Sequence, residues 1–185
     1  MNKHKGGFTI VELLIVIVVI GILAAIVIVA YNGVQTRAAN SQTQTALVSW
    51  VKAINMYRVD QGSMPPGWVC LGENYPFGES GTDTTGAQCR RDASTNFTTS
   101  ESFNNLLKPY LGGSLPTPHM TTVSRSDGTW RRGLMYAATG GSGNVSYILA
   151  AYKGDIPCVN VTGSESVSKS TWTGDTLCTY TIEER

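Results

Sequence analysis

The hydrophobic pattern of the chain is dominated by one apolar run near its amino-terminal end, residues 8–31. Glu12 is the only charged side chain inside this run, whose other members are apolar or small except for Thr9 and Tyr31. About 20 apolar residues in a helix cross the hydrocarbon core of a bilayer, so the run is long enough to be a transmembrane helix. A charged side chain deep in a membrane costs about 2.5–3.5 kcal/mol on insertion scales. Glu12 is therefore a candidate functional residue.

A second helical pattern occupies residues 32–61, which contain no proline and one internal glycine, Gly33. Its apolar positions include the spacing that marks one face of a helix. They are Val34, Ala38, Ala46, Leu47, Trp50, Val51, Ile54 and Tyr57. Gly62 favours a helix C-cap, and Pro65 and Pro66 remove backbone donors. We therefore expect one helix from the apolar run to about residue 61, with this face packed on the domain that follows.

The pattern changes after this helix. Residues 62–98 are rich in Gly, Ser, Thr and Asn and predict an irregular loop region, with Cys70 and Cys89 near its two ends. Residues 98–111 predict a short helix, which Thr99 or Ser100 can cap. Its apolar face consists of Phe103, Leu106, Leu107 and Tyr110, and Pro109, Gly112 and Gly113 limit its extent.

The last third of the chain predicts an antiparallel sheet of three or four strands. The candidate strands are residues 134–138, 145–152, 156–161 and 176–182, and residues 139–144 suit a hairpin turn. A sheet packed against the outer half of the long helix would bury both apolar faces. The predicted fold class is α+β, with a long amino-terminal helix packed on a small antiparallel sheet.

The four cysteines predict two disulfide bonds if the domain is exported, although four cysteines permit three pairings. We favour Cys70–Cys89 and Cys158–Cys178 because each bond closes a loop of about 20 residues, worth about 3 kcal/mol in the chain-entropy model. A cysteine metal site would need close pairs such as Cys-x-x-Cys, and the sequence has none.

The residues around the start of the apolar run resemble a known signal. The leader MNKHKGG, followed by FTIVELLIVI, is similar to the class III signal of type IV pilins and the related pseudopilins. The resemblance covers about the first thirty residues and implies a pilin-like α+β fold. It also implies that a prepilin peptidase cleaves after Gly7, that the new amino terminus at Phe8 is N-methylated, and that the apolar run is retained.

The resemblance also implies a role for Glu12, which would offset the amino-terminal charge of a neighbouring subunit during filament assembly. Many members of the family have a helix-breaking proline near the end of the run, where this chain has Val29. Gly21 alone disfavours a helix by only about 1 kcal/mol. Whether the helix melts near Gly21 is therefore left open.

Two other interpretations of the apolar run explain less. A secretory signal peptide is cleaved after its apolar core, whereas the glycine pair of this chain precedes the core. A plain single-pass anchor explains the length of the run but neither the Gly7–Phe8 junction nor Glu12.

Composition limits the partners. The chain has 185 residues with 14 Lys and Arg against 13 Asp and Glu, and removal of Lys3 and Lys5 with the leader leaves 12 against 13. Near neutrality gives no electrostatic reason for nucleic acid as an obligatory partner. The basic leader orients the amino terminus toward the cytoplasm, so everything after Tyr31 would lie outside.

The sequence offers little catalytic chemistry. His119 is the only histidine outside the leader, and it follows Pro118 without a Gly-x-Ser-x-Gly elbow, so we interpret it as a solvated loop residue. No P-loop, dinucleotide fingerprint or metalloprotease motif occurs, and we predict no enzyme, cofactor or metal site. Two basic pairs, Arg90 with Arg91 and Arg131 with Arg132, are interpreted as solvated, although pairs beside Trp130 could contact DNA if the filament serves DNA uptake.

We therefore expect a cleaved leader (residues 1–7), a transmembrane and polymerisation segment (8–31), an amphipathic helical half (32–61) that contacts both its own domain and other subunits, and an extracellular globular domain (62–185). The predicted function is a structural subunit of a type IV pilus-like filament, membrane-anchored before processing and then assembled as a homo-oligomer at the cell surface by the pilus machinery. The alternatives are a pseudopilin of a type II secretion or DNA-uptake system, and a membrane-tethered binding module or enzyme that does not polymerise.

Overall fold

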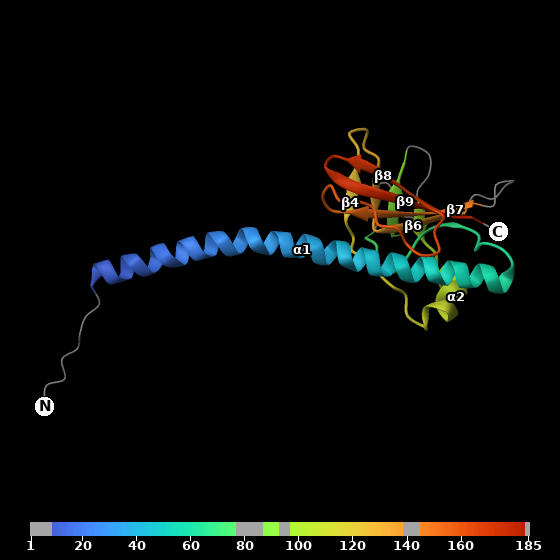
Figure 1. The fold of residues 1–185 in the computed structure, drawn as a ribbon, viewed down its shortest axis with the longest axis horizontal. Helices are drawn as coiled ribbons and strands as arrows, with labels where there is room; N and C mark the ends of the chain where they lie inside the picture. The colour runs from blue at the N-terminus through green and yellow to red at the C-terminus, as the bar shows by residue number, and fades with distance from the viewer. Residues whose placement is uncertain (1–8, 77–86, 93–96, 139–144, 184–185) are drawn as a thin grey trace, which may run out of the picture. The chain divides into compact units, whose positions relative to one another are not determined.

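The computed structural model describes residues 9–76 (for residue 29, the backbone only), 87–92, 97–138 and 145–183 (Figure 1). The chain divides into two compact units, Met1–Arg37 and Ala38–Arg185. The first helix, α1 (Ile10–Gln61), contributes residues to both units. The backbone is helical without interruption past Gly21, where an added Cβ would meet no other part of the chain within 4 Å. The question of melting near Gly21 is thus answered in favour of a continuous helix.

The carboxyl-terminal part of α1 provides the predicted packing face. Leu47, Trp50, Val51 and Ile54 are all 0% exposed, as the spacing of their positions indicated. Val34 and Ala38, at the start of the stripe, are exposed, so the packing on the domain begins further along the helix and the expected contact of this half with other subunits stays a prediction. The helix ends as expected: the Gly62 N–H donates to the Arg58 carbonyl at 2.9 Å, with Gly62 at a φ of 70°.

Among the residues that the structure describes, the second unit also contains a nine-stranded sheet in the order β4-β5-β2-β3-β1-β6-β7-β9-β8. All neighbouring pairs are antiparallel except β1 with β3. In chain order, the strands are β1 (Trp68–Cys70), β2 (Gln88–Arg91), β3 (Phe97–Thr99), β4 (Thr122–Ser124), β5 (Trp130–Arg132), β6 (Leu134–Ala138), β7 (Val145–Tyr152), β8 (Ser166–Trp172) and β9 (Asp175–Glu183). The α+β class is confirmed, whereas the expected three or four strands were too few.

Two buried clusters cover the two faces of this sheet. The first cluster joins α1 and α2 (Glu101–Leu107) to one face and includes Trp50, Phe103, Tyr136 and Tyr180. In Figure 1 this face of the sheet lies alongside the carboxyl-terminal part of α1. The second cluster, on the other face, includes Phe97, Met135 and Leu177. The outer half of the long helix therefore supplies part of the domain's own core, as expected.

The strands with strong apolar alternation were predicted correctly. Residues 134–138 and 145–152 are β6 and β7, and residues 176–182 lie within β9. The predicted turn at residues 139–144 lies outside the described residues. The predicted strand at residues 156–161 is absent from the described chain, where Pro157 cannot donate to a ladder. The edge strand is instead β8, which is mostly polar and exposed and so carries no hydrophobic signal.

The region predicted as an irregular loop, residues 62–98, contains β1, β2 and the start of β3. Strands of three or four residues are too short to show alternation. Both β1 and β2 pair with β3, and each also has a partner from a distant segment, β6 for β1 and β5 for β2. The short helix was predicted correctly. The Ser100 hydroxyl caps α2 by accepting the Phe103 N–H, and the 3₁₀ helix η1 (Lys108–Leu111) follows directly.

Both disulfides of the structure join the pairs favoured from loop length. Cys70 bonds to Cys89, which links β1 to β2, and Cys158 bonds to Cys178, which ties the segment after β7 to β9. The two bonds span sequence separations of 19 and 20 residues.

Candidate functional site

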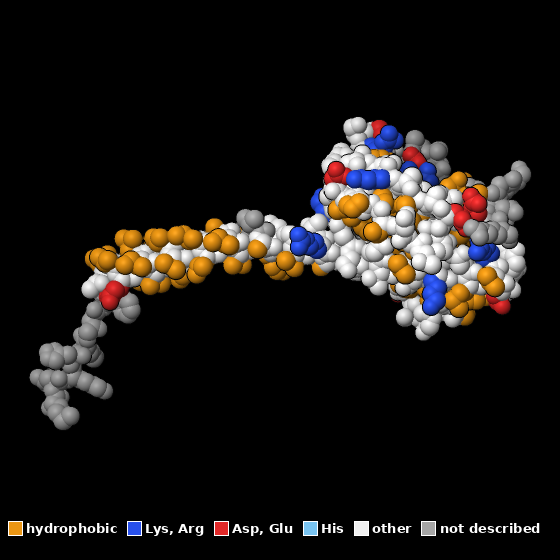
Figure 2. All heavy atoms as spheres, viewed as in Figure 1, with side chains coloured by type: hydrophobic (Ala, Val, Ile, Leu, Met, Phe, Trp, Pro, Cys, Tyr) orange, Lys and Arg blue, Asp and Glu red, His pale blue; other side chains and the backbone are white. Residues whose placement is uncertain are grey.

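The amino-terminal part of α1 is an apolar segment, residues 10–28, whose large hydrophobic side chains are 47–84% exposed. Figure 2 shows hydrophobic atoms along this part of the helix on the face in view. Among the described residues, α1 is the one helix long and apolar enough to cross a membrane. Exposed apolar surface of this extent marks a membrane or protein contact.

Glu12 lies in the first turn of α1 and closes a capping box with Thr9. The Thr9 N–H and hydroxyl both donate to Glu12 Oε2, at 2.8 and 2.7 Å, and the Glu12 N–H donates to the Thr9 hydroxyl at 3.2 Å. The carboxylate thus satisfies two donors at a helix start, where four N–H groups lack helical partners. The Thr-x-x-Glu spacing was visible in the sequence, but our sequence analysis considered only the charge of Glu12.

The predicted cleavage site, Gly7 and Phe8, lies outside the described residues. Thr9, one residue after Phe8, is the first residue that the structure describes. The capping box therefore positions the Glu12 carboxylate at the residue that directly follows Phe8 in the sequence.

One of the two basic pairs is less exposed than predicted, whereas Arg91 of the other pair is exposed, as expected. Arg131 and Arg132 are only 8% and 6% exposed, so the interpretation of both as solvated was wrong. Strand β5 carries them into the sheet, where the Arg131 guanidinium lies 5.4 Å from the Trp172 ring centre and that of Arg132 lies 4.9 Å from Trp130. Both guanidinium groups are therefore buried in the domain and contact aromatic rings there, so neither is accessible enough to bind a polyanion.

Asp92 forms the ion pairs of this cluster. Its carboxylate bonds to the Arg90 guanidinium and accepts from Arg131 Nη2 at 2.9 Å. The hydrogen bond from Arg90 lowers the pKa of Asp92 below its ordinary value, and the charge of Arg131 adds to this effect. The carboxylate therefore stays ionised and stabilises two neighbouring cations.

His119 is an exposed loop residue whose Nδ1 lies 3.0 Å from the Thr121 hydroxyl. Within the described ranges, no group of three or more His, Cys, Asp or Glu side chains is placed to hold a metal ion.

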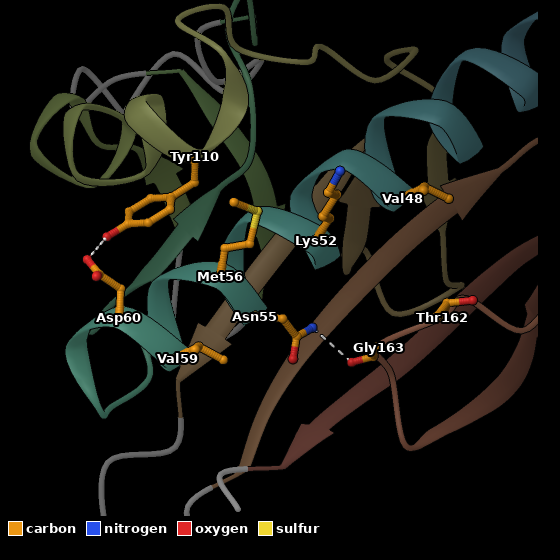
Figure 3. Close-up of a pocket in the computed structure, with 9 residues that line it drawn as sticks. All are labelled: Val48, Lys52, Asn55, Met56, Val59, Asp60, Tyr110, Thr162 and Gly163. Carbon is orange, nitrogen blue, oxygen red and sulfur yellow. Dashed lines mark hydrogen bonds between the residues drawn. The ribbon is translucent and has the colours of Figure 1, made fainter.

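A groove of about 860 Å³ in the second unit was not predicted from the sequence (Figure 3). It is lined by residues of α1, by Tyr110 of η1 and by the loop between β7 and β8: Val48, Lys52, Asn55, Met56, Val59, Asp60, Tyr110, Thr162 and Gly163. The Tyr110 hydroxyl donates to Asp60 at 2.5 Å, and Asn55 Nδ2 donates to the Gly163 carbonyl at 2.9 Å. The bond from Tyr110 lowers the pKa of the Asp60 carboxyl below its ordinary value. No local pattern reveals a groove built from three such distant segments.

The amino-terminal segment matches a known family model. Residues 2–28 match the family model described as the prokaryotic N-terminal methylation motif. The match contains the predicted junction and Glu12, and it confirms the resemblance that the sequence suggested.

The relatives include a secretion-system core protein and pilin or fimbrial proteins. The chain is 32% identical over 64 residues to the type II secretion system core protein G of Aeromonas hydrophila, covering 35% of this chain and 45% of that protein. It is 37% identical over 65 residues to a type IV major pilin of Neisseria gonorrhoeae, covering 35% and 39%, and equally identical over 65 residues to a fimbrial protein of Neisseria meningitidis, covering 35% and 38%. The chain thus spans less than half the length of these relatives. No solved structure matches it significantly.

Proposed function

We propose that the protein is the structural subunit of a type IV pilus-like filament, held in the cytoplasmic membrane before processing and assembled at the cell surface afterwards. One observation carries this proposal: the methylation motif coincides with an apolar helical segment whose large side chains are all at least 47% exposed. In the precursor, this segment spans the membrane with its amino terminus in the cytoplasm, supported by the basic leader.

The exposed segment gives a physical reason for polymerisation. A long apolar helix that leaves the lipid must cover its surface, since exposed apolar area costs about 25 cal/mol per Å². Contact between different surfaces of identical subunits does not close on itself and generates a helical filament. The proposed partners are further copies of this chain and the assembly machinery.

Processing is the first step of this function and has a direct test. A prepilin peptidase would cleave between Gly7 and Phe8, and methylation would then modify the Phe8 amine. Mass spectrometry of the membrane-bound and filament protein should find N-methyl-Phe8 at the amino terminus. Gly7→Leu should leave the precursor uncut, whereas Gly33→Leu should be processed normally, because a Cβ added at Gly33 would meet no group within 4 Å. Protein that retains Met1, or that begins after Tyr31, would contradict the proposal.

Glu12 is proposed to act in assembly. Cleavage would create a cation at the Phe8 amine, and the carboxylate already bonded to the Thr9 N–H lies close to it in sequence. Pairing with the amine of its own chain or of a neighbouring subunit would reduce the cost of keeping a carboxylate in apolar surroundings.

The variant Glu12→Gln tests this role, with Glu101→Gln, an exposed carboxylate of α2, as the matched control. Glu12→Gln should leave processed protein in the membrane at a near-parental level but yield few sheared filaments, whereas the control should yield the parental amount. Normal filaments from Glu12→Gln would reject the assembly role. Loss of the membrane-bound monomer would indicate instead that the carboxylate stabilises its own chain.

The similarity to core protein G favours a second candidate, a pseudopilin of a type II secretion or DNA-uptake system. Shearing surface filaments and sequencing their main protein separates the two: this chain should be the main component of a pilus, but absent from sheared material if it is a pseudopilin. A DNA-uptake role has less support, because Arg131 and Arg132 are buried. A tethered module that does not polymerise predicts activity after deletion of residues 8–31, which should abolish the function of a filament subunit.

A further inference from the structure

One face of the sheet points away from α1, and the second buried cluster covers only part of it. Val69, Tyr136 and Ile148 belong to the cluster that packs on α1. Because successive side chains of a strand point to opposite faces, their chain neighbours point the other way. The strand registers then place on this second face the residues that we call the outer face: Trp68, Ala137, Tyr147, Leu149, Ser166, Ser168, Thr179 and Thr181.

The outer face is accessible to a partner. Trp68 is 55% exposed, the two serines are exposed, and the other members are half-buried. Burial of a tryptophan side chain is favourable, so a core role alone does not account for an exposed one. Among the described residues, the hydroxyl groups of Tyr147, Thr179 and Thr181 have no hydrogen-bond partner. The outer face thus offers both apolar surface and hydrogen-bonding groups.

Two contacts hold Trp68 in a fixed orientation. Its indole N–H donates to the Ala138 carbonyl at 2.6 Å, and its ring stacks on that of Phe97, with ring centres 5.9 Å apart and planes 27° apart. Tyr147 lies two strands further across the sheet, about 10 Å away at the usual strand spacing. The outer face therefore presents two aromatic rings on rigid strands, which lowers the entropy lost when a partner binds.

The outer face carries no charged side chain. Glu183 at the end of β9 and Arg90 flank it, and Arg90 is already paired with Asp92. DNA or an anionic membrane would need cations at this surface, and a stable protein interface would need a larger apolar centre. Aromatic rings beside uncharged hydroxyl groups suit a ligand that has apolar ring faces and many hydroxyl groups of its own.

We propose that the outer face binds a neutral polysaccharide. Trp68 and Tyr147 stack on sugar rings of one extended chain, and the hydroxyl groups of Thr179 and Thr181 form hydrogen bonds with sugar hydroxyls. Filament assembly does not require this binding, so the inference goes beyond the proposed function. Repetition of the face along a filament would raise the avidity for a long polysaccharide without any new contact.

The test uses the full-length chain in a detergent that has no sugar group, mixed with insoluble cellulose, chitin or starch as neutral polysaccharides and with immobilised heparin as a charged one. The parent should bind a neutral polysaccharide, and added salt should not weaken this binding. Trp68→Ala should weaken it about tenfold or more, since truncation of an aromatic anchor is among the costliest changes at an interface. Tyr147→Ala should weaken it several-fold, whereas Trp68→Phe should retain most of the affinity.

The hydroxyl groups are tested by Thr181→Val, with Thr171→Val as the matched control. Thr171 is an exposed threonine of β8 whose side chain points to the opposite face of the sheet. Valine keeps the shape and the strand preference of threonine, so both variants should fold. Thr181→Val should weaken binding and Thr171→Val should leave it unchanged. Thermal unfolding of each variant checks the fold, and if Trp68→Ala does not fold, Tyr147→Ala and Thr181→Val decide the outcome.

Several results would overturn the proposal. They are absence of binding to all three neutral polysaccharides, binding that folded Trp68→Ala and Tyr147→Ala variants retain in full, and tighter binding to heparin than to the neutral chains. Self-association in sedimentation that Trp68→Ala abolishes would assign the outer face to a second copy instead. Each of these results leaves the proposed function standing, because processing and filament yield are measured separately.

Discussion

Two parts of helix α1 differ in the exposure of their apolar side chains. In the apolar segment, residues 10–28, the large hydrophobic side chains are 47–84% exposed, whereas Leu47, Trp50, Val51 and Ile54 are 0% exposed. Backbone hydrogen bonds within the helix and the Thr9–Glu12 capping box suffice to form the first part. The second part is held by side chains from α2 and from the sheet. The same secondary structure thus leaves surface for partners at one end and builds a core at the other.

The largest expected effect is on the free energy of unfolding, and it is tested by one truncation to alanine in each part of α1. Trp50→Ala should lower the free energy of unfolding of the domain by about 3–5 kcal/mol, because it empties a buried site and removes the indole donor that bonds to the Pro116 carbonyl at 2.8 Å. Leu23→Ala, at a 57% exposed position, should leave it unchanged. Guanidinium unfolding of the full chain in detergent, followed by tryptophan fluorescence, measures both. Equal effects would show that the apolar segment contributes to the stability of the domain.

Loss of a disulfide should affect the domain alone. The variant Cys158→Ser/Cys178→Ser opens a loop with a sequence separation of 20 residues, which should cost about 3 kcal/mol of unfolding free energy. The equivalent change at Cys70 and Cys89 should cost about as much, since its separation is 19. Denaturation of each pair variant beside the parent gives the values, and circular dichroism should still show the amino-terminal helix. Loss of that helix signal would contradict the independence of the two parts.

A single glycine tests how tightly the second unit is packed. Gly133 has a φ of 60°, and a Cβ on it would lie 2.7 Å from the Tyr75 hydroxyl, which also accepts the Leu134 N–H at 3.0 Å. Gly133→Ala should destabilise the domain by about 2–3 kcal/mol through backbone strain and this clash. Gly128→Ala shares a positive φ of 83° but meets no group within 4 Å, so it should cost only the strain, about 1 kcal/mol. If the two variants unfold at the same denaturant concentration, the clash is relieved at no cost.

The smallest expected effect concerns acid stability. Hydrogen bonding from Arg90 and the charge of Arg131 hold the pKa of Asp92 below its ordinary value. A lowered folded-state pKa adds stability that is present above the unfolded pKa and is lost as the pH falls through the folded value, here below about pH 4. Asp92→Asn should remove up to about 1 kcal/mol at pH 7 and flatten the loss of stability at acid pH. Unfolding curves at pH 7, 4 and 3 measure this, and an unchanged acid slope would exclude Asp92 as its cause.

The strands show why part of the fold was predictable. Strands β6, β7 and β9 carry apolar positions that pack on the two clusters, and this pattern located them closely. Strand β8 lies at the edge of the sheet and is mostly exposed, so its sequence has no need for apolar alternation. Strands β1, β2 and β5 are three or four residues long and depend on pairing with distant segments. Local pattern fails where a strand is exposed or short.

The features of the candidate site also fall into two groups, those that could be predicted from the sequence and those that could not. The run around Glu12 and the methylation motif are continuous in the sequence, because membrane crossing and helix capping depend on neighbouring residues. Local sequence was therefore enough to predict the long helix, its apolar segment, its packing face and its end at Gln61. The burial of Arg131 and Arg132 depends on the tertiary fold, and so does the groove that Tyr110 and Gly163 form with α1. The physical reason is that these features come from contacts between residues tens of positions apart, whose proximity is set by sheet order and close packing rather than by local conformation.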